Sequence, residues 1–291
     1  MTAPTEAGIA PLVSRLAAAT QARRPLRAIG AANAVAAKVA VETGFDALWV
    51  SGLEVSTALG LPDENVLGSR DLADTVLALT RTAELPVIVD IDNAGGTLAA
   101  ARRFAGDLAR AGAAALCLED SAYPKANSFA LHRSQALADT DAVAAQLVAM
   151  RGVVGTQVAL IARTEALICG ESVTEAVERA ATYAACGADA VLIHSKDATG
   201  QQALAAAAAW TGTVPLVTVP TAFAHLSPED LGAAGFALAI YANQLSRAAL
   251  AAMRSVATSF QTTGSFTADG TALSDVADLL QVADPAARAC L

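Results

Sequence analysis

Pro86-Val-Ile-Val-Asp-Ile-Asp92 and Ala115-Leu-Cys-Leu-Glu-Asp120 are two short apolar runs that each end in carboxylates, and a helix-length segment separates them. Two runs joined in this way are predicted to be neighbouring parallel strands of a right-handed β-α-β unit. Side chains alternate along a strand, so Asp90 and Asp92 are expected to project to the same side. The acidic side chains of both strands should therefore meet at one strand-end face.

Carboxylates grouped without histidine or cysteine suit a hard divalent cation, magnesium before zinc. We therefore predict a Mg²⁺ site formed by Asp90, Asp92 and Glu119, with Asp120 as a fourth candidate. The alternative interpretation is that these residues cap helices or lie in solvated loops, because acidic residues after strands are common.

The same alternation of strand and helix continues along the whole chain. Strands are expected over eight ranges: 27–33, 46–52, 87–92, 114–120, 157–164, 188–195, 214–220 and 236–243. No change in composition marks a second domain, so we expect one domain over residues 1–291. It would begin with a helix at about 10–22 and end with a helix at about 273–282. Eight such units predict an α/β fold of the closed (β/α)8 TIM-barrel type. An open doubly wound sheet is the alternative, but no G-x-G-x-x-G follows the first strand.

Composition limits the classes of partner. Hydrophobic residues make up 54% of the chain, many of them alanine, which favours close-packed helices. No apolar run reaches the roughly 18 residues of a membrane span, and the N-terminus lacks a signal-peptide pattern, so a cytoplasmic location is expected. The formal charge of −9 argues against nucleic acid or an anionic membrane as partner, but it is compatible with a small anionic substrate. The four cysteines are expected to be free thiols.

Active-site residues of a TIM barrel lie at the carboxyl ends of its strands. The polar residues expected there are Ser51, Asp90, Asp92, Glu119, Asp120, Arg163, Glu165, His194, Ser195 and Asn243. Arg163 could hold a carboxylate or phosphoryl group, or it could pair with Glu165 or Glu119. His194 could bind an anion or be structural.

Loop residues add two further candidates. Ser51 and Gly52 are expected to form a tight turn whose N–H groups could bind an anion. Asp63 lies in a Pro-Asp-Glu loop, where a turn role is the alternative to a functional one. The irregular segment 121–138 is long enough to be a lid or a binding loop.

Several segments in order resemble the isocitrate lyase and phosphoenolpyruvate mutase superfamily over about residues 25–285. They are Trp49-Val-Ser-Gly-Leu53, Asp90-Ile-Asp92, Ile161-Ala-Arg-Thr-Glu-Ala-Leu167, Ile193-His-Ser-Lys196, Val219-Pro-Thr221 and Ile240-Tyr-Ala-Asn243. The Lys-Lys-Cys-Gly-His loop of the lyases is missing. Glu119-Asp-Ser-Ala-Tyr-Pro-Lys-Ala-Asn-Ser128 instead resembles the signature of the phosphoenolpyruvate mutases, and Asn127 stands where phosphonopyruvate hydrolases typically have threonine.

Two positions depart from the family pattern. Ser121 replaces the signature lysine, which removes a cation. Asp90-Ile-Asp-Asn-Ala-Gly-Gly-Thr97 replaces Asp-x-Asp-Thr-Gly-Tyr-Gly-Asn, which changes the loop beside the acidic residues. These departures leave open a changed substrate or reaction.

The resemblance implies a magnesium-dependent phosphoenolpyruvate mutase that acts on phosphoenolpyruvate or phosphonopyruvate. It implies that Asp90 binds the metal, while Asp92 and Glu119 hold its waters. The implied substrate-binding residues are Trp49, Ser51, Gly52, Leu53, Asp90, Arg163 and His194. Lys125, Asn127 and Ser128 would hold the migrating phosphoryl group, and Asp63 would be a nucleophile or an orienting carboxylate.

Other interpretations stay open. One is a phosphonopyruvate hydrolase or a related enzyme that cleaves C–P or C–C bonds, and another is a catalytically silent barrel that acts as a binding protein. The resemblance also implies a homotetramer or homodimer whose subunits exchange the last helix.

Overall fold

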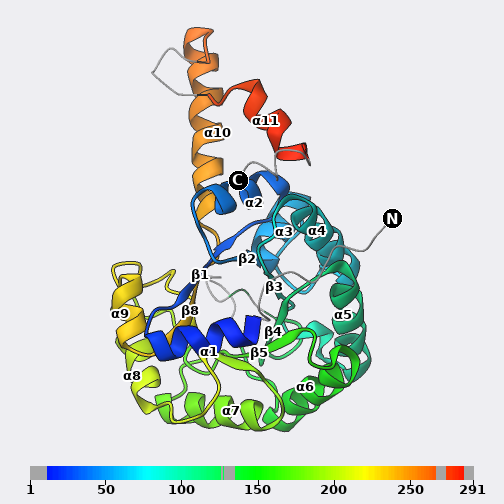
Figure 1. The fold of residues 1–291 in the computed structure, drawn as a ribbon, viewed down its shortest axis with the longest axis vertical. Coiled ribbons are helices and arrows are strands. Elements are labelled where there is room, and N and C mark those ends of the chain that lie inside the picture. Colours follow the sequence, from blue (N-terminus) through cyan, green and yellow to red (C-terminus); the bar gives the residue numbers. More distant parts are fainter. Residues whose placement is uncertain (1–11, 126, 128–134, 267–272, 285–291) are drawn as a thin grey trace.

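The chain forms a closed barrel of eight parallel strands, as the sequence predicts (Figure 1). The computed structural model describes residues 12–125, 127, 135–266 and 273–284. The strands are paired in sequence order, and β8 closes the barrel against β1. They are β1 (Leu26–Gly30), β2 (Ala47–Val50), β3 (Val87–Asp90), β4 (Ala115–Glu119), β5 (Ala159–Thr164), β6 (Ala190–Ile193), β7 (Leu216–Thr218) and β8 (Phe236–Tyr241).

Helices connect consecutive strands around the barrel, and further helices precede the first strand and follow the last (Figure 1). They are α1 (Leu12–Ala22), α2 (Ala34–Glu42), α3 (Gly52–Leu59), α4 (Ser69–Thr82), the 3-10 turn η1 (Ala94–Gly96), α5 (Leu98–Ala111), α6 (Thr140–Val154), α7 (Val173–Ala185), α8 (Gln201–Ala209), α9 (Pro228–Ala233), α10 (Gln244–Thr263) and α11 (Val276–Ala283). Within the described ranges, no helix has the length and hydrophobicity that a membrane span requires.

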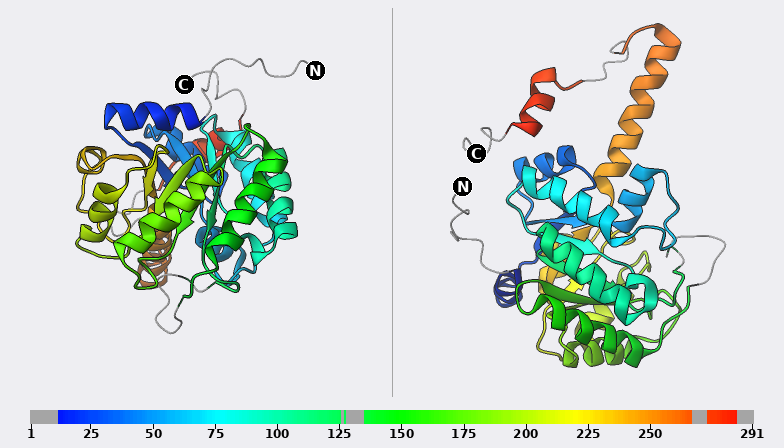
Figure 2. Two further views of the ribbon diagram at one scale, coloured as in Figure 1. Left: turned by 90° about the horizontal axis from the view of Figure 1, so that it is seen from below. Right: turned by 90° about the vertical axis from the view of Figure 1, so that its right-hand side faces the viewer.

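Helix α1 covers the amino-terminal end of the barrel (Figure 2). Leu12 and Leu16 are buried and pack with interior residues such as Ile88 and Trp49. Burial of such side chains supplies most of the favourable free energy of folding. Because α1 and the packed interior fill this end, a ligand has access to the barrel from the carboxyl ends of the strands.

Three local expectations were wrong. The tight turn expected at Ser51 and Gly52 is instead the start of helix α3, which covers residues 52–59 and ends at Gly60 in the left-handed conformation. Strand β3 ends at Asp90, because Asp92 has a φ of 50° and so leaves the extended conformation. Strand β1 ends at Gly30, and Asn33 caps α2 by accepting a hydrogen bond from Ala36 N.

Helices α10 and α11 form an arm that projects from the barrel (Figures 1 and 2). Helix α10 continues to Thr263, and Ser259 is the residue of this helix that is buried. Helix α11 lies against α2. Large apolar side chains on the arm are exposed, among them Met253, Val276 and Leu280.

The cysteines that the structure describes are free, as expected. Cys117 is buried inside strand β4, whereas Cys169 and Cys186 are partly exposed. Cys290 lies outside the described residues.

Candidate active site

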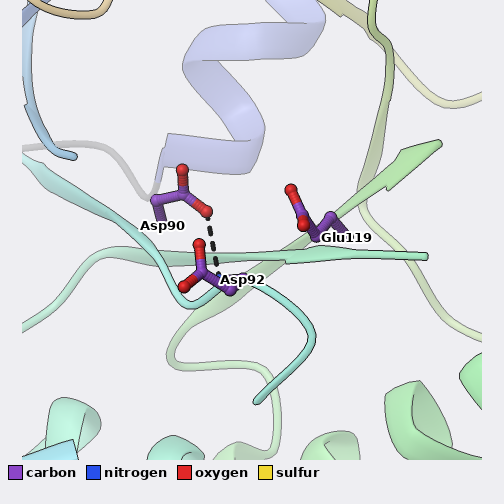
Figure 3. A group of neighbouring side chains, drawn as sticks. All are labelled: Asp90, Asp92 and Glu119. Atoms are coloured by element: carbon purple, nitrogen blue, oxygen red, sulfur yellow. Dashed lines mark hydrogen bonds between the residues drawn. The ribbon is translucent and has the colours of Figure 1, made fainter. Parts of the chain in front are cut away.

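Three carboxylates meet at the carboxyl ends of β3 and β4 (Figure 3). Asp90 is the last residue of β3, Asp92 follows in a turn, and Glu119 is the last residue of β4. One oxygen from each lies within 4.8 Å of the others, and all three residues are buried. The structure therefore brings together the three residues for which the sequence predicts a metal site.

Asp90 and Asp92 were expected to project to the same side as alternate residues of one strand. The structure brings them together by backbone contacts beyond the end of β3 instead. Strands β3 and β4 pair in parallel with Asp90 opposite Cys117. Beyond the strand, Ile91 N donates to Cys117 O at 3.0 Å and Glu119 N donates to Asp92 O at 2.9 Å. The chain therefore stays hydrogen-bonded to β4 beyond the end of β3. Asp92 is in the left-handed conformation, and its side chain lies toward Asp90 (Figure 3). Asp90 Oδ1 accepts a hydrogen bond from Asp92 N at 3.2 Å.

Asp120, the fourth candidate, is not part of this group. Its carboxylate accepts hydrogen bonds from Thr164 Oγ1 at 2.8 Å, Glu165 N at 2.7 Å and Tyr183 Oη at 2.9 Å. Arg179 pairs with the same carboxylate at 3.3 Å. Asp120 is completely buried and joins β4, β5 and α7, which is a structural role.

Arg163 is the central cation of the site. Its Nη1 lies 3.4 Å from Asp90 Oδ2, and its Nη2 lies 3.4 Å from Glu119 Oε2. Its Nε donates to Glu165, and Glu165 also contacts His194 Nδ1 at 2.8 Å. The pairing with Glu165 and Glu119, considered as the structural alternative, is therefore present. The same contacts hold the guanidinium and the imidazole side by side at the mouth of the barrel.

A second buried cation, Lys125, comes from the segment after β4. Its Nζ pairs with Asp92 and lies 2.9 Å from Asp63 Oδ1. Asn127 Nδ2 donates to the other oxygen of Asp63. Asp63 is therefore held in the site by two long-range contacts and is more than a turn residue. Ser128 lies outside the described residues.

These residues surround a cavity of about 80 Å³. It is lined by Trp49, Ser51, Leu53, Asp63, Asp90, Glu119, Lys125, Asn127, Arg163, His194, Val219, Thr221, Ala242 and Asn243. Ser51 is the N-cap of α3, so the expected tight turn at Ser51 and Gly52 is the amino terminus of a helix. The first N–H groups of a helix have no partner within it and favour anions.

Sequence analysis missed Val219, Thr221 and Ala242 as lining residues and gave Asn243 no function. The available signal was their place in Val219-Pro-Thr221 and Ile240-Tyr-Ala-Asn243, which lie at the carboxyl ends of the seventh and eighth strands. Residues directly after barrel strands lie at the active-site end.

Burial and neighbouring charges shift the titration of the site. Desolvation raises the pKa of Glu119 to about 8, although Arg163 opposes the shift. Desolvation likewise raises the pKa of Asp92 to about 6, against the effect of Lys125. Burial would lower the pKa of Lys125, but Asp92 and the other carboxylates raise it above its ordinary value. The buried carboxylates are thus incompletely neutralised by the protein's own cations.

The donor set fits Mg²⁺. The carboxylates that line the cavity or pair with its cations are Asp63, Asp90, Asp92, Glu119 and Glu165, whereas the paired cations are Lys125 and Arg163. An all-oxygen group with excess negative charge is the environment that a hard dication prefers. Asp90, Asp92 and Glu119 are the residues able to hold it.

Comparison with known proteins agrees with this chemistry. Residues 16–261 match the family model described as phosphoenolpyruvate phosphomutase. A phosphoenolpyruvate phosphomutase of Streptomyces hygroscopicus is 40% identical over 78% of this chain and 73% of its own. A phosphonopyruvate hydrolase of Variovorax sp. (strain Pal2) is 34% identical over 92% of this chain and 93% of its own.

Solved structures show the same likeness. The crystal structure of a phosphonopyruvate hydrolase in complex with oxalate and Mg²⁺ superposes with a TM-score of 0.86. It is 33% identical and covers 95% of this chain and 96% of its own. The likeness to both kinds of enzyme extends over most of the barrel. The chain is therefore an enzyme of the phosphoenolpyruvate mutase and phosphonopyruvate hydrolase branch of the phosphoenolpyruvate mutase/isocitrate lyase superfamily.

Proposed function

We propose that this enzyme is a magnesium-dependent phosphoenolpyruvate mutase that interconverts phosphonopyruvate and phosphoenolpyruvate. The C3–P bond of phosphonopyruvate breaks, its electron pair forms the enolate of pyruvate, and the enolate oxygen then bonds to the phosphoryl group. No water is consumed and no proton is gained or lost. The observation that carries this proposal is that Lys125 and Asn127 occupy both carboxylate oxygens of Asp63 at the cavity.

Asp63 is a carboxylate that contacts both Lys125 and Asn127. A hydrolase needs a group that accepts a proton from the attacking water. Here one oxygen of Asp63 is paired with an ammonium and the other accepts from an amide, and both contacts lower the tendency of this carboxylate to take a proton from water. Transfer of a loose, metaphosphate-like group requires that water be excluded. The contacts of Asp63 thus favour transfer back to the substrate over hydrolysis.

The start of helix α3 provides groups for the substrate's carboxylate. Helix α3 begins at Gly52, and its N-cap Ser51 and its second residue Leu53 line the cavity beside Trp49. A helix amino terminus favours a carboxylate through its partial positive charge. Bound Mg²⁺, held by Asp90, Asp92 and Glu119, would stabilise negative charge on the substrate's oxygens.

Arg163 and His194 complete the electrostatic environment. Burial would raise the pKa of Glu165, but Arg163 and then His194 lower it well below its ordinary value, so Glu165 stays ionised. An ionised Glu165 fixes the guanidinium and the imidazole, and fixed donors stabilise developing charge without reorganisation. We assign to Arg163 and His194 the stabilisation of the phosphoryl group and the enolate oxygen.

Phosphonopyruvate hydrolase is the second candidate. Ser121 places a neutral hydroxyl where the mutase signature has a lysine, and the Variovorax hydrolase aligns with 92% of this chain. In a hydrolase the same C–P cleavage would be followed by addition of water to phosphorus, and the enolate would take up a proton to give pyruvate.

Phosphorus NMR of the purified enzyme with Mg²⁺ and phosphonopyruvate distinguishes the two reactions. A mutase converts the phosphonate resonance into that of phosphoenolpyruvate. Formation of inorganic phosphate and pyruvate without phosphoenolpyruvate would reject the mutase assignment. A chain with neither activity but with retained affinity for oxalate would support a binding protein.

A further inference from the structure

Three neutral side chains form a layer beside Asp92 and Glu119: Asn65, Asn93 and Ser121. The hydroxyl of Ser121 donates to Glu119 Oε1. Asn65 Nδ2 lies 3.4 Å from Asp92 Oδ2. Asn93 joins the two, because its Nδ2 lies 3.4 Å from Ser121 Oγ and 3.3 Å from Asn65 Oδ1. A continuous set of hydrogen bonds thus connects two of the three candidate metal ligands.

The two departures from the family pattern contact each other in this layer. Asn93 Nδ2 also donates to Ser121 O at 3.3 Å, and both residues are buried. Asn93 is held in turn, since Gln146 Nε2 donates to its carbonyl oxygen at 3.1 Å and Gly95 N donates to its Oδ1 at 3.2 Å. The changed loop and the missing lysine are therefore one connected alteration.

The direction of these hydrogen bonds follows from the chemistry of the groups. A carboxylate that holds a metal ion is ionised and only accepts, so in that state the Ser121 hydroxyl donates to Glu119 and accepts from Asn93. The amide of Asn65 likewise donates to Asp92 while its oxygen accepts from Lys125 N at 2.6 Å. Each carboxylate thus has a donor whose own orientation is fixed by another residue.

We infer that Asn65, Asn93 and Ser121 are positioning residues that set the affinity of the acidic site for its divalent cation by orienting Asp92 and Glu119. This inference depends on the proposed metal site. Residues that orient metal ligands commonly change metal affinity by about 10- to 100-fold when they are substituted. The three side chains of this layer are neutral. A neutral hydrogen-bond donor orients a carboxylate but does not cancel the negative charge with which the carboxylate attracts the cation. The lysine that the family pattern has at position 121 would instead bring a competing cation.

The chain offers substitutions that test this inference without disturbing the backbone. Ser121→Ala removes the donor to Glu119 and adds no volume. Asn65 has a φ of 58°, so Asn65→Gly removes the amide where glycine is favoured. Ser69→Ala is a matched control, because the buried Ser69 hydroxyl also donates to a carboxylate, Asp107 Oδ2 at 2.6 Å, outside the site.

The experiment is isothermal titration calorimetry of MgCl₂ into metal-free protein without substrate, with thermal unfolding in EDTA to confirm that each variant is folded. Ser121→Ala and Asn65→Gly are expected to weaken binding at least tenfold, whereas Ser69→Ala stays within about twofold of wild type. The loss of Mg²⁺-binding free energy in the double variant Ser121→Ala/Asn65→Gly should be smaller than the sum of the losses in the two single variants, because the residues act as a unit.

Mg²⁺ affinity equal to that of wild type in both variants would overturn the inference while leaving the metal site intact. An equal loss in Ser69→Ala would overturn it as well, because the effect would then be one of general stability. A wild-type protein that binds no Mg²⁺ would instead refute the metal site on which the proposed function depends. If Ser121→Ala does not fold, Asn65→Gly alone decides between these results.

Discussion

The ammonium of Lys125 lies 2.9 Å from Asp63 Oδ1 and also pairs with Asp92. One buried cation thus joins the loop before α4, the turn after β3 and the segment after β4. These three parts of the chain are far apart in sequence, and their common position at the cavity organises the site.

Removal of this cation is the first prediction. Lys125→Met keeps the volume of the side chain but leaves Asp63 and Asp92 without their partner. We expect kcat to fall on the order of a hundredfold, as for loss of one preorganised electrostatic group. Steady-state assay of phosphonopyruvate conversion measures it. Lys38→Met, which breaks the Lys38–Glu42 pair on α2 outside the site, is the control and should leave kcat unchanged. Near-wild-type activity in Lys125→Met would show that Lys125 is structural.

Asn127 is predicted to suppress hydrolysis. Asn127→Thr removes the amide that donates to Asp63, so one oxygen of this carboxylate becomes available to a water molecule. A hydrogen bond to a charged group contributes about 1.5–3 kcal/mol, so the ratio of phosphate to phosphoenolpyruvate should rise at least tenfold. Phosphorus NMR measures both products in one sample. An unchanged ratio would mean that Asn127 does not control access of water.

Mg²⁺ binding is predicted to release protons. Burial raises the pKa of Glu119 from 4.5 to about 8 and that of Asp92 from 3.8 to about 6, whereas the cation requires both groups ionised. Affinity should therefore increase as the pH rises from 6 to 8. Calorimetry at pH 7 in buffers of different ionisation enthalpy measures the released protons. Affinity independent of pH over this range would contradict protonated carboxylates in the metal-free site.

The same pKa values predict how metal-free protein responds to pH. A carboxyl group whose pKa is raised on folding binds more protons in the folded state. The free energy of unfolding should therefore decrease as the pH rises from about 4.5, the ordinary pKa of Glu119, through its folded value of about 8. Urea unfolding in EDTA measures this decrease. Added Mg²⁺ should oppose the decrease most strongly at the upper end of the range.

Asp120 is predicted to affect stability and not metal binding. Asp120→Asn leaves the partners Arg179 and Glu165 N with an altered acceptor in a fully buried position. Disruption of a buried ion pair costs about 3–5 kcal/mol in unfolding free energy. Mg²⁺ affinity, measured by calorimetry, should change less than threefold, whereas Asp90→Asn should abolish binding. A large loss of affinity in Asp120→Asn would assign this residue to the metal site.

Self-association through the α10–α11 arm is the last prediction. Leu279 and Leu280 are exposed on α11, and the expected exchange of this helix between subunits would cover them. Light scattering after size-exclusion chromatography should give the mass of a dimer or tetramer for the wild type and a smaller mass for Leu280→Glu. The substitution Arg254→Glu, on α10, also adds negative charge to the arm and serves as the control. A monomeric wild type would exclude the exchange.

Much of the fold follows from local pattern. Eight apolar runs alternate with helix-length segments, and the parallel barrel is the arrangement that buries runs such as 190–193 and 47–50 on both faces. The helix at 52–59 was missed because its sequence, Gly-Leu-Glu-Val-Ser-Thr-Ala-Leu, contains β-branched and small residues that are weak helix formers. Its place after strand β2, the burial of Glu54 and Val55, and the left-handed Gly60 at its end outweigh these propensities.

The contacts within the site follow less directly from the sequence than the fold does. Adjacent residues of a strand point to opposite faces, so Asp120 could have been separated from Glu119 by the same alternation that was applied to Asp90 and Asp92. The contacts of Asn65 with Asn93 and Lys125 span 28 and 60 residues. Such contacts depend on how loops are packed above the barrel, which no local pattern in a single sequence specifies.

The central claim, intramolecular transfer without water, is tested most directly by phosphorus NMR of phosphonopyruvate, Mg²⁺ and enzyme in ¹⁸O-labelled water. We predict that phosphoenolpyruvate forms and that its phosphoryl group contains no ¹⁸O. Inorganic phosphate carrying one ¹⁸O atom, formed together with pyruvate and without phosphoenolpyruvate, would contradict the claim.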